Sequence, residues 1–401
     1  MNKYDAIIIG GGPAGLYAAV SIAEGFNVLV LEKDDKIGEP IICAEGISNN
    51  TLKNFFRGEN LPFIRNRYSI ITINYKEKKA TIEIPDMGLL VNRSLFDNYI
   101  AEKALKKGVE IKLNTLVIDA QVKENFVLII TKKEEYEAKM VIVAEGVESY
   151  IGQKLGFDAV CQLNDMYSCY QYHIKDDSIN DDEILFDFSP EFAPGGFIWV
   201  FPRGDKEANF GLGVNAEMMK NRPLDTLKSY KDKFYPNAEI KREMSGCVSV
   251  NPLSRIYGER AIVVGDAARY ADPMTGGGID NALRTGGFAG QVASIVLKED
   301  NFSLKKMSLY GEFVEKDNWY SIKKQLQLKK LISDMSEEEL DKFFNSSLEL
   351  FDGNKIFSSD FYSATYSIKS KVKTAGLLYH FLGSLMKDKY LLKIIMRLLW
   401  Q

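Results

Sequence analysis

The residues with the clearest chemical meaning are three glycines near the start of the chain. Gly10, Gly12 and Gly15 follow an apolar run and fit the spacing G-x-G-x-x-G. At this spacing the first glycine allows a tight turn, the second lets the backbone approach a pyrophosphate, and the third lets a helix pack on a strand. The next apolar run ends at Glu32, at the distance expected of a carboxylate that binds a ribose. These features predict a strand, a turn and a helix that bind a dinucleotide, with the phosphates at the helix N-terminus.

A second glycine-rich turn comes late in the chain. The apolar run 261–264 ends at Gly265-Asp266, and Gly276-Gly277-Gly278 precedes a segment that reads as a helix. A helix start of this kind can bind an anion or a polar ring. Asp266 could accept hydrogen bonds from the ribityl chain of a cofactor, or it could cap the helix.

Two further residues are candidates for the same site. Cys43 follows the second predicted strand, where it is either a small packed residue or a thiol beside a reactive ring; with no adjacent base, no covalent chemistry is expected. Arg93 stands at the start of a helix predicted to run to Lys107 and capped by Asn92 or Ser94. Arg93 could reach a ribose or phosphate, or it could be a solvated surface charge.

Aromatic residues gather on one predicted strand. Phe197, Trp199 and Phe201 alternate along the chain, so the period of two places them on one face of a sheet. Such a face could wall a long apolar cavity, and it could equally be an ordinary aromatic core.

The order of the predicted elements indicates an α/β protein. The sequence predicts a hairpin over 67–85 and about four short strands over 109–143, which form a meander inserted between parallel strands. An alternating β region follows over 156–254. We expect a Rossmann-like dinucleotide-binding domain with a parallel sheet and a β-meander insertion, an antiparallel-sheet substrate domain, and C-terminal helices. The expected boundaries are 1–155 with 255–300 for the first domain, 50–88 with 156–254 for the second, and 301–401 for the helices.

Composition excludes several classes of protein. The chain has 401 residues and a formal net charge of −4, which gives no general case for nucleic-acid binding. Its four cysteines form no C-x-x-C pair and it has two histidines, so we expect neither a disulfide framework nor a metal site.

The chain enters its first strand without a signal-peptide pattern, which favours a cytoplasmic protein. Residues 371–401 are basic and amphipathic; they could lie on an anionic membrane surface or pack on the body with their lysines outward.

Taken together, the motifs resemble the FAD-binding domain shared by flavin hydroxylases and related reductases, and within that group the geranylgeranyl reductase family. The specific likeness is the loop Cys43-Ala-Glu-Gly46, with Phe197-x-Trp199-x-Phe201-Pro202 followed after eight residues by Gly211-x-Gly213. Family members carry Cys-Gly-Glu-Gly and Tyr-x-Trp-x-Phe-Pro here, so Ala44 and Phe197 depart from the pattern. Gly152 stands where hydroxylases usually carry an arginine, which weakens a hydroxylase interpretation.

The resemblance implies an FAD-dependent oxidoreductase that saturates isolated C=C bonds of prenyl chains of lipids, such as archaeal-type digeranylgeranylglycerophospholipids. The residues expected to bind FAD, from the sequence motifs and from the resemblance together, are Gly10, Gly12, Ala14, Gly15, Glu32, Lys33, Cys43, Ala44, Gly46, Arg93, Val117, Gly265, Asp266, Gly276, Gly277, Gly278 and Ile279. The residues that it assigns to the prenyl cavity are Phe197, Trp199, Phe201, Pro202, Gly211 and Gly213. For catalysis, Trp199 could stabilise positive charge on the alkene by cation–π attraction, and Cys43, Tyr172 or a water could supply the proton.

Two other functions stay open from the sequence. One is a flavin-dependent monooxygenase acting on an aromatic or lipid substrate. The other is a non-catalytic flavoprotein that docks on membranes through its basic tail. The sequence holds no second complete nucleotide fingerprint, so NAD(P)H would bind transiently, or ferredoxin or a deazaflavin would donate the electrons.

Overall fold

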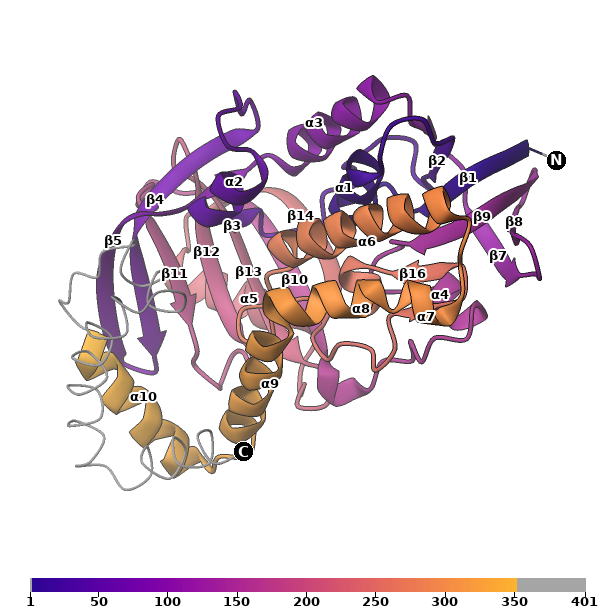
Figure 1. The fold of residues 1–401 in the computed structure, drawn as a ribbon. Helices are drawn as coiled ribbons and strands as arrows, with labels where there is room; N and C mark the ends of the chain where they lie inside the picture. Colours follow the sequence, from indigo (N-terminus) through magenta and orange to yellow (C-terminus); the bar gives the residue numbers. More distant parts are fainter. Residues whose placement is uncertain (1, 352–401) are drawn as a thin grey trace, which may run out of the picture.

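The computed structural model describes residues 2–351 and shows two eight-stranded sheets side by side (Figure 1). Residue 1 and residues 352–401 lie outside the described part, and so does the basic segment 371–401.

The first sheet is the predicted dinucleotide-binding scaffold. Its strand order is β15-β16-β9-β1-β2-β6, with β1, β2, β6, β9 and β16 parallel, and a β7-β8 hairpin joins it through β9. The strands are β1 (Asn2–Ile9), β2 (Val28–Leu31), β6 (Glu110–Lys112), β7 (Val117–Val122), β8 (Val127–Thr131), β9 (Glu135–Val143), β15 (Tyr257–Gly258) and β16 (Ala261–Val263). The parallel sheet and the inserted meander are therefore both confirmed.

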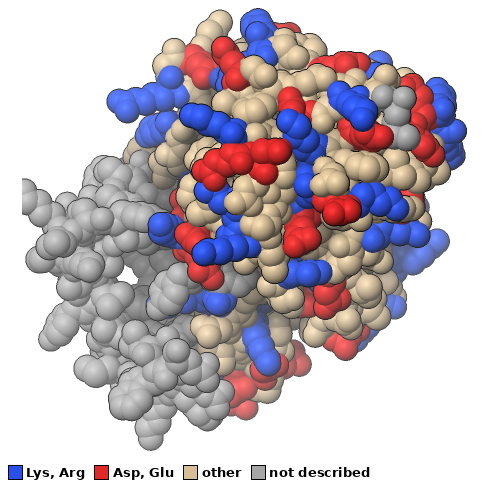
Figure 2. Space-filling model, turned by 45° about the vertical axis from the view of Figure 1, so that its right-hand side comes forward, with Lys and Arg blue, Asp and Glu red and all other residues tan. Residues whose placement is uncertain are grey.

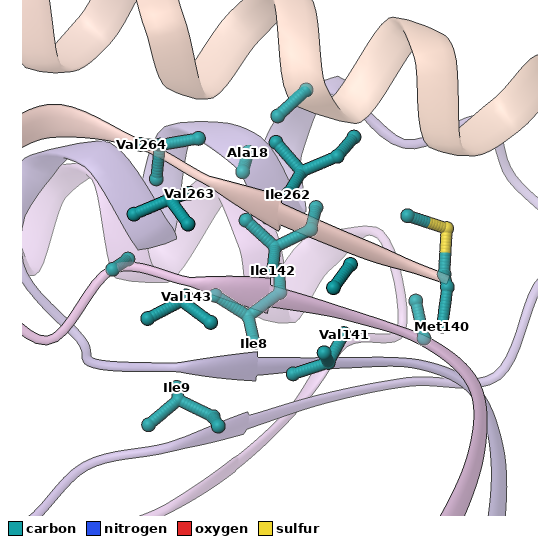
Figure 3. Close-up of a cluster of buried hydrophobic side chains, with 14 of the residues drawn as sticks. Ile8, Ile9, Ala18, Met140, Val141, Ile142, Val143, Ile262, Val263 and Val264 are labelled. Atoms are coloured by element: carbon teal, nitrogen blue, oxygen red, sulfur yellow. The ribbon is translucent and has the colours of Figure 1, made fainter. Parts of the chain in front are cut away.

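Both faces of this sheet are covered by other parts of the chain. The segments of the parallel strands that are buried therefore carry no charged side chains. Ile8, Ile142 and Ile262 pair across three neighbouring strands and are fully buried, below the helix layer drawn in Figure 3. Burying each such side chain contributes roughly 1.5–3 kcal/mol. This core fixes the carboxyl ends of the strands, where the glycine turns follow.

Helices α1 (Pro13–Ser21) and α6 (Ile279–Glu299) pack on each other beside this sheet (Figure 1). Glycines let them approach closely, because a Cβ at Gly286 would collide with the carbonyl oxygen of Ala14 and one at Gly290 with that of Ala18. The close approach brings the N-termini of both helices, and hence both glycine turns, to one end of the sheet. Three other short elements in this part of the chain are α2 (Asn49–Phe55), α4 (Tyr150–Lys154) and the 3₁₀ turn η2 (Gly265–Ala268).

Helix α3 (Arg93–Lys106) begins as predicted. The Asn92 side chain accepts a hydrogen bond from the backbone N–H of Leu95 at 3.1 Å, so Asn92 is the cap. The cap fixes the position of Arg93 at the first turn.

The second sheet has the order β14-β10-β13-β12-β11-β4-β5-β3 and is antiparallel except for the β11–β4 pair. Its strands are β3 (Gly46–Ser48), β4 (Ile64–Tyr75), β5 (Lys78–Val91), β10 (Met166–Lys175), β11 (Glu183–Asp187), β12 (Phe197–Gly204), β13 (Glu207–Asn215) and β14 (Glu239–Ser249). The turn η1 (Leu163–Asp165) leads into β10, and α5 (Pro223–Phe234) packs on one face of the sheet. Strand β3 and the end of β5 extend this sheet beyond the expected limits of 50 and 88, because Gly46–Ser48 pairs with residues 88–90.

The C-terminal helices divide between the two sheets. They are α7 (Leu304–Met307), α8 (Leu309–Val314), the π-helical turn η3 (Glu315–Trp319), α9 (Tyr320–Ser333) and α10 (Glu337–Phe351). Helices α7 and α8 pack beside α6 on the first sheet, and α10 packs on the second sheet against β5. Helix α10 is held to β4 because the Tyr75 hydroxyl donates to Asp341 at 2.6 Å and the Tyr75 ring stacks on Phe344 at 4.2 Å. No helix in the described part of the chain is both long and apolar enough to cross a bilayer.

Candidate functional site

A cavity of about 680 Å³ lies where the two sheets meet. One wall is the aromatic face of β12, and residues of α9 and α10 line the opposite side. The inner end is formed by the loop 43–46, by Asp266 and by the glycines 276–278. The volume is in the range of small-molecule sites, and the lining is mainly apolar with a few polar groups.

A second, smaller cavity of about 170 Å³ adjoins the first. It is lined by Gly11, Gly12 and Glu32, and it shares Ile42 and Arg93 with the large cavity. The two cavities therefore form one elongated site that runs from the end of β2 to the aromatic wall. An elongated polar-to-apolar site of this kind fits a dinucleotide whose ring system ends beside the aromatic cavity.

The glycine turn has the geometry that the motif requires. Gly10 has a φ of +107°, and a Cβ at Gly15 would collide with the carbonyl oxygen of Gly10. At Gly12, by contrast, a Cβ would meet no described atom within 4 Å, so the space next to its backbone is open to a ligand. Glu32 holds the turn by accepting hydrogen bonds from the N–H of Gly11 at 2.5 Å and of Asp34 at 2.9 Å. Each carboxylate oxygen keeps a further lone pair for a ligand hydroxyl.

Arg93 is held inside the site and is not a solvated surface charge. Its Nε donates to Asp97 Oδ1 at 3.0 Å and its Nη2 donates to Asp97 Oδ2 at 2.8 Å, a forked pair that is largely buried. The fork fixes the guanidinium between the two cavities, beside Cys43.

Cys43 lines the inner end of the large cavity. Burial raises the pKa of the Cys43 thiol above its ordinary value, and the adjacent Arg93 guanidinium offsets part of that rise. The sulfur is therefore a neutral thiol at pH 7, which can donate a proton and is a poor nucleophile.

The carboxylate of Glu45 holds this loop, and the sequence did not single it out. Glu45 is 1% exposed and has a φ of +67°. It pairs with Arg203, accepts from Asn209 Nδ2 at 2.9 Å and accepts from the backbone N–H of Arg93 at 3.0 Å. One carboxylate thus joins the loop 43–46 to β12, to β13 and to the start of α3.

Gln171 is a second residue that sequence reasoning missed. The indole N–H of Trp199 donates to Gln171 Oε1 at 2.8 Å, and Gln171 Nε2 donates to the carbonyl oxygen of Cys43 at 3.1 Å. The buried amide therefore links the aromatic wall to the cysteine loop. Gln171 stands two residues from Cys169 on β10, so the period of two places both side chains on the same face. This spacing was the signal in the sequence that could have found Gln171.

The predicted aromatic face exists, and two glycines shape it. Phe197, Trp199 and Phe201 all line the cavity. A Cβ at Gly211 would collide with the Trp199 ring, so this glycine gives the indole its place. Gly213 lines the cavity directly.

Two predicted site residues are corrected by the structure. Tyr172 is 2% exposed and packs with Phe210 in the core below α5, on the face of β10 that points away from the cavity. Pro202 follows Phe201 on β12, so its ring is on the opposite face; it is buried there and is not among the described residues that line the cavity. Both errors have one cause, since neighbouring residues of a strand point to opposite faces.

The remaining predicted cofactor residues fall into two groups. Ala44, Gly46, Asp266, Gly276, Gly277, Gly278 and Ile279 line the large cavity. Ala14 and Gly265 are buried against each other and shape the turns. Lys33 reaches Glu148 at 3.5 Å and Val117 is buried at the start of β7, and neither is among the described residues that line the two cavities.

Two further features of the described part of the chain are its surface charge and the residue types that bind metals. Lys/Arg and Asp/Glu side chains are interspersed on the face drawn in Figure 2. Within residues 2–351, no three His, Cys, Asp or Glu side chains gather as a set of metal ligands.

Comparisons with known proteins agree with this geometry. A family model described as the geranylgeranyl reductase catalytic domain matches residues 165–250, and one described as pyridine nucleotide-disulphide oxidoreductase matches residues 7–151. The digeranylgeranylglycerophospholipid reductase of Methanosarcina acetivorans is 33% identical over 92% of this chain and 94% of its own length. The protein of the same name from Methanosphaerula palustris is 35% identical over 78% of this chain and 81% of its own.

Solved structures show the same fold. A geranylgeranyl bacteriochlorophyll reductase-like protein from Thermoplasma acidophilum matches with a TM-score of 0.85 and 26% identity, over 99% of this chain and all of the other. A p-nitrophenol 4-monooxygenase from Pseudomonas putida matches with a TM-score of 0.67 and 16% identity over 88% of this chain and 95% of the other, which shows the fold alone. The glycine turns, the aromatic cavity and these likenesses agree: the chain belongs to the geranylgeranyl reductase family and is a flavin-dependent oxidoreductase.

Proposed function

We propose that this protein is an FAD-dependent reductase that saturates the isolated C=C bonds of geranylgeranyl chains in digeranylgeranylglycerophospholipids. The observation that carries the proposal is the aromatic cavity of about 680 Å³, which opens directly from the glycine-turn site. The names of the relatives above support the choice of substrate.

The residues present fit FAD. Gly12 leaves open space at the N-terminus of α1, where backbone N–H groups would bind the pyrophosphate. Glu32 would bind the adenosine ribose, and Asp266 with Gly276–Gly278 would hold the ribityl chain and ring system at the inner end of the large cavity. When bound and reduced, FAD supplies the hydride.

The aromatic cavity would hold the prenyl chain and exclude water. An isolated alkene has no electron-withdrawing group, so positive charge develops at its more substituted carbon as it is reduced. The face of Trp199 can stabilise this charge, an interaction worth roughly 0.5–2 kcal/mol. Gln171 fixes the indole through the hydrogen bond to its N–H, and Gly211 leaves room for the ring. The hydride adds to one alkene carbon and a proton to the other, and we assign the proton to the Cys43 thiol.

Replacing Trp199 by alanine should slow alkene reduction about tenfold and leave reduction of the flavin by dithionite unchanged. Trp199→Phe keeps an aromatic face and should lose less. Stopped-flow absorbance of the flavin measures both half-reactions. Equal slowing of the two half-reactions in Trp199→Ala would reject this role for the indole.

The proposed function is tested with the purified protein under anaerobic conditions. Dithionite-reduced protein is mixed with digeranylgeranyl phospholipid in micelles, and the lipid is analysed by mass spectrometry. We expect a mass gain of one H₂ for each double bond. Hydroxylated lipid that forms only with oxygen would favour a monooxygenase, and bound FAD without any lipid product would favour a non-catalytic flavoprotein.

We propose further that an external donor reduces the flavin and that the protein works in the cytoplasm at the membrane surface, where its lipid substrate lies. The same lipid assay, run with NAD(P)H, ferredoxin or a reduced deazaflavin in place of dithionite, identifies the donor.

A further inference from the structure

The large cavity contains one charged side chain that the proposed chemistry does not use. Among the described residues, four charged side chains line this cavity: Glu45, Arg93, Asp266 and Lys329. Glu45 pairs with Arg203 and Arg93 with Asp97, and Asp266 lies at the inner end that fits the flavin. Lys329 of α9 is left over.

Lys329 has no anionic partner of its own within residues 2–351. Its ammonium lies 3.9 Å from the centroid of the Tyr167 ring, a cation–π contact with β10. Asp165 and Asp272 act on it only at longer range, and no carboxylate of a described residue forms an ion pair with it. Burial lowers the pKa of the Lys329 amine to about 8. Because a half-buried charge without a counter-ion is costly, its presence beside an apolar cavity indicates that the ligand supplies the anion.

The position of the lysine tells which part of a ligand it would meet. Lys329 lines the cavity and is itself only partly buried, so it lies at the boundary between the cavity and solvent, whereas Lys330 is exposed. A ligand that fills the aromatic interior with apolar chains would place its polar end at this boundary. A compact ammonium is a good point-charge partner for phosphate.

We propose that Lys329 binds the phosphate of the lipid headgroup and thereby selects anionic prenyl lipids over uncharged ones. This inference rests on the proposed function, since it names the residue that recognises the substrate's headgroup. The group that Lys329 would bind is a phosphate ester. We assign this phosphate to the headgroup of a prenyl glycerophospholipid.

The test compares Lys329→Met with Lys330→Met, which removes the same charge from the solvent side of the same helix. Each variant is assayed anaerobically with three substrates in neutral detergent: digeranylgeranyl glycerophospholipid, digeranylgeranylglycerol and geranylgeranyl diphosphate. We expect Lys329→Met to raise the KM for the phospholipid about tenfold and to leave the KM for digeranylgeranylglycerol unchanged. Lys330→Met should match the wild type on all substrates, and Lys329→Arg should retain most of the preference for the phospholipid.

The pH profile gives a second readout. The groups that act on Lys329 are Asp165 from η1, Asp272 from the loop before α6 and the Tyr167 ring from β10. In the wild type, the KM for the phospholipid should rise as the pH increases through about 8, because the free amine loses its proton there. This rise should be missing in Lys329→Met.

Failure of the inference can be told apart from failure of the proposed function. Binding of the phospholipid to the oxidised protein, followed by tryptophan fluorescence, needs no turnover. Equal phospholipid binding by wild type and Lys329→Met overturns the inference, and so does a KM increase confined to geranylgeranyl diphosphate. Weaker binding by Lys329→Met supports the inference even if the wild type saturates no lipid, an outcome that would overturn the proposed function alone. Misfolding is excluded if Lys329→Met melts at or above the wild-type temperature, as expected when an unpaired half-buried charge is removed.

Discussion

Replacing Glu45 by glutamine is expected to lower the free energy of unfolding by about 3–5 kcal/mol, because it breaks a buried ion pair on one side only. Arg203 is 12% exposed and would keep its charge without a partner. Glutamine keeps one acceptor oxygen, so it can accept from either Asn209 or the N–H of Arg93, and the loss includes one hydrogen bond besides the unpaired charge. Denaturant unfolding followed by circular dichroism measures it.

The consequence of Glu45→Gln for the site should be visible as well. Glu45 orders the loop that contains Cys43, so the variant should also bind FAD more weakly, which the flavin absorbance of the dialysed protein reports. Glu338→Gln is the matched control, because Glu338 pairs with Lys342 at 2.6 Å but is 78% exposed. An exposed helical pair of this kind contributes about 0.3–0.5 kcal/mol. A loss below about 1 kcal/mol in Glu45→Gln would show that the Glu45–Arg203 pair does not hold the loop.

Replacing Cys43 by alanine is expected to slow alkene reduction by about 100-fold, the lower end of the contribution of a general acid. The flavin content and the rate of flavin reduction by dithionite should stay close to those of the wild type. Cys43→Ser keeps the size of the side chain but is a weaker acid, so it should recover only part of the rate. A full rate in Cys43→Ala would mean that water supplies the proton.

The pH dependence of alkene reduction follows from the direction of the Cys43 pKa shift. The thiol must be protonated to act as an acid, and burial raises its pKa. The rate should therefore be flat up to a pH of about 8.5, the ordinary pKa of a cysteine thiol, and fall only above it. The profile is measured at saturating substrate so that binding to Lys329 does not contribute, and a fall centred well below pH 8.5 would contradict the assignment of the proton to Cys43.

The parts of the site that could be predicted from the sequence are those with a local cause. Gly10, Gly12 and Gly15 lie within one turn, and the alternation of Phe197, Trp199 and Phe201 lies within one strand. Each pattern therefore specified its own geometry, and the structure shows both the turn and the aromatic face. The cap of helix α3 is also a local feature. Asn92 and Ser94 are both good capping residues, so only the structure shows that Asn92 is the cap.

The parts that could not be predicted depend on contacts between distant segments. Asn209 and Glu45 are 164 positions apart, and Gln171 and Cys43 are 128 positions apart. These contacts form only when the loop before β3 lies against β10 and β13 of the second sheet, which leaves no mark on either segment alone. The sequence offers Tyr172 as one of three candidate proton donors, yet it is the neighbouring Gln171 that faces the cavity, because in a strand a difference of one residue reverses the face.

Reduced flavin bound in this site should pass its electrons to a prenyl double bond. An anaerobic single turnover measures this transfer: fully reduced protein is mixed with excess digeranylgeranyl phospholipid, and flavin absorbance and lipid mass are followed in the same sample. We predict that one double bond is saturated for each flavin reoxidised. Flavin that stays reduced until oxygen is admitted, with every double bond intact, would contradict the claim.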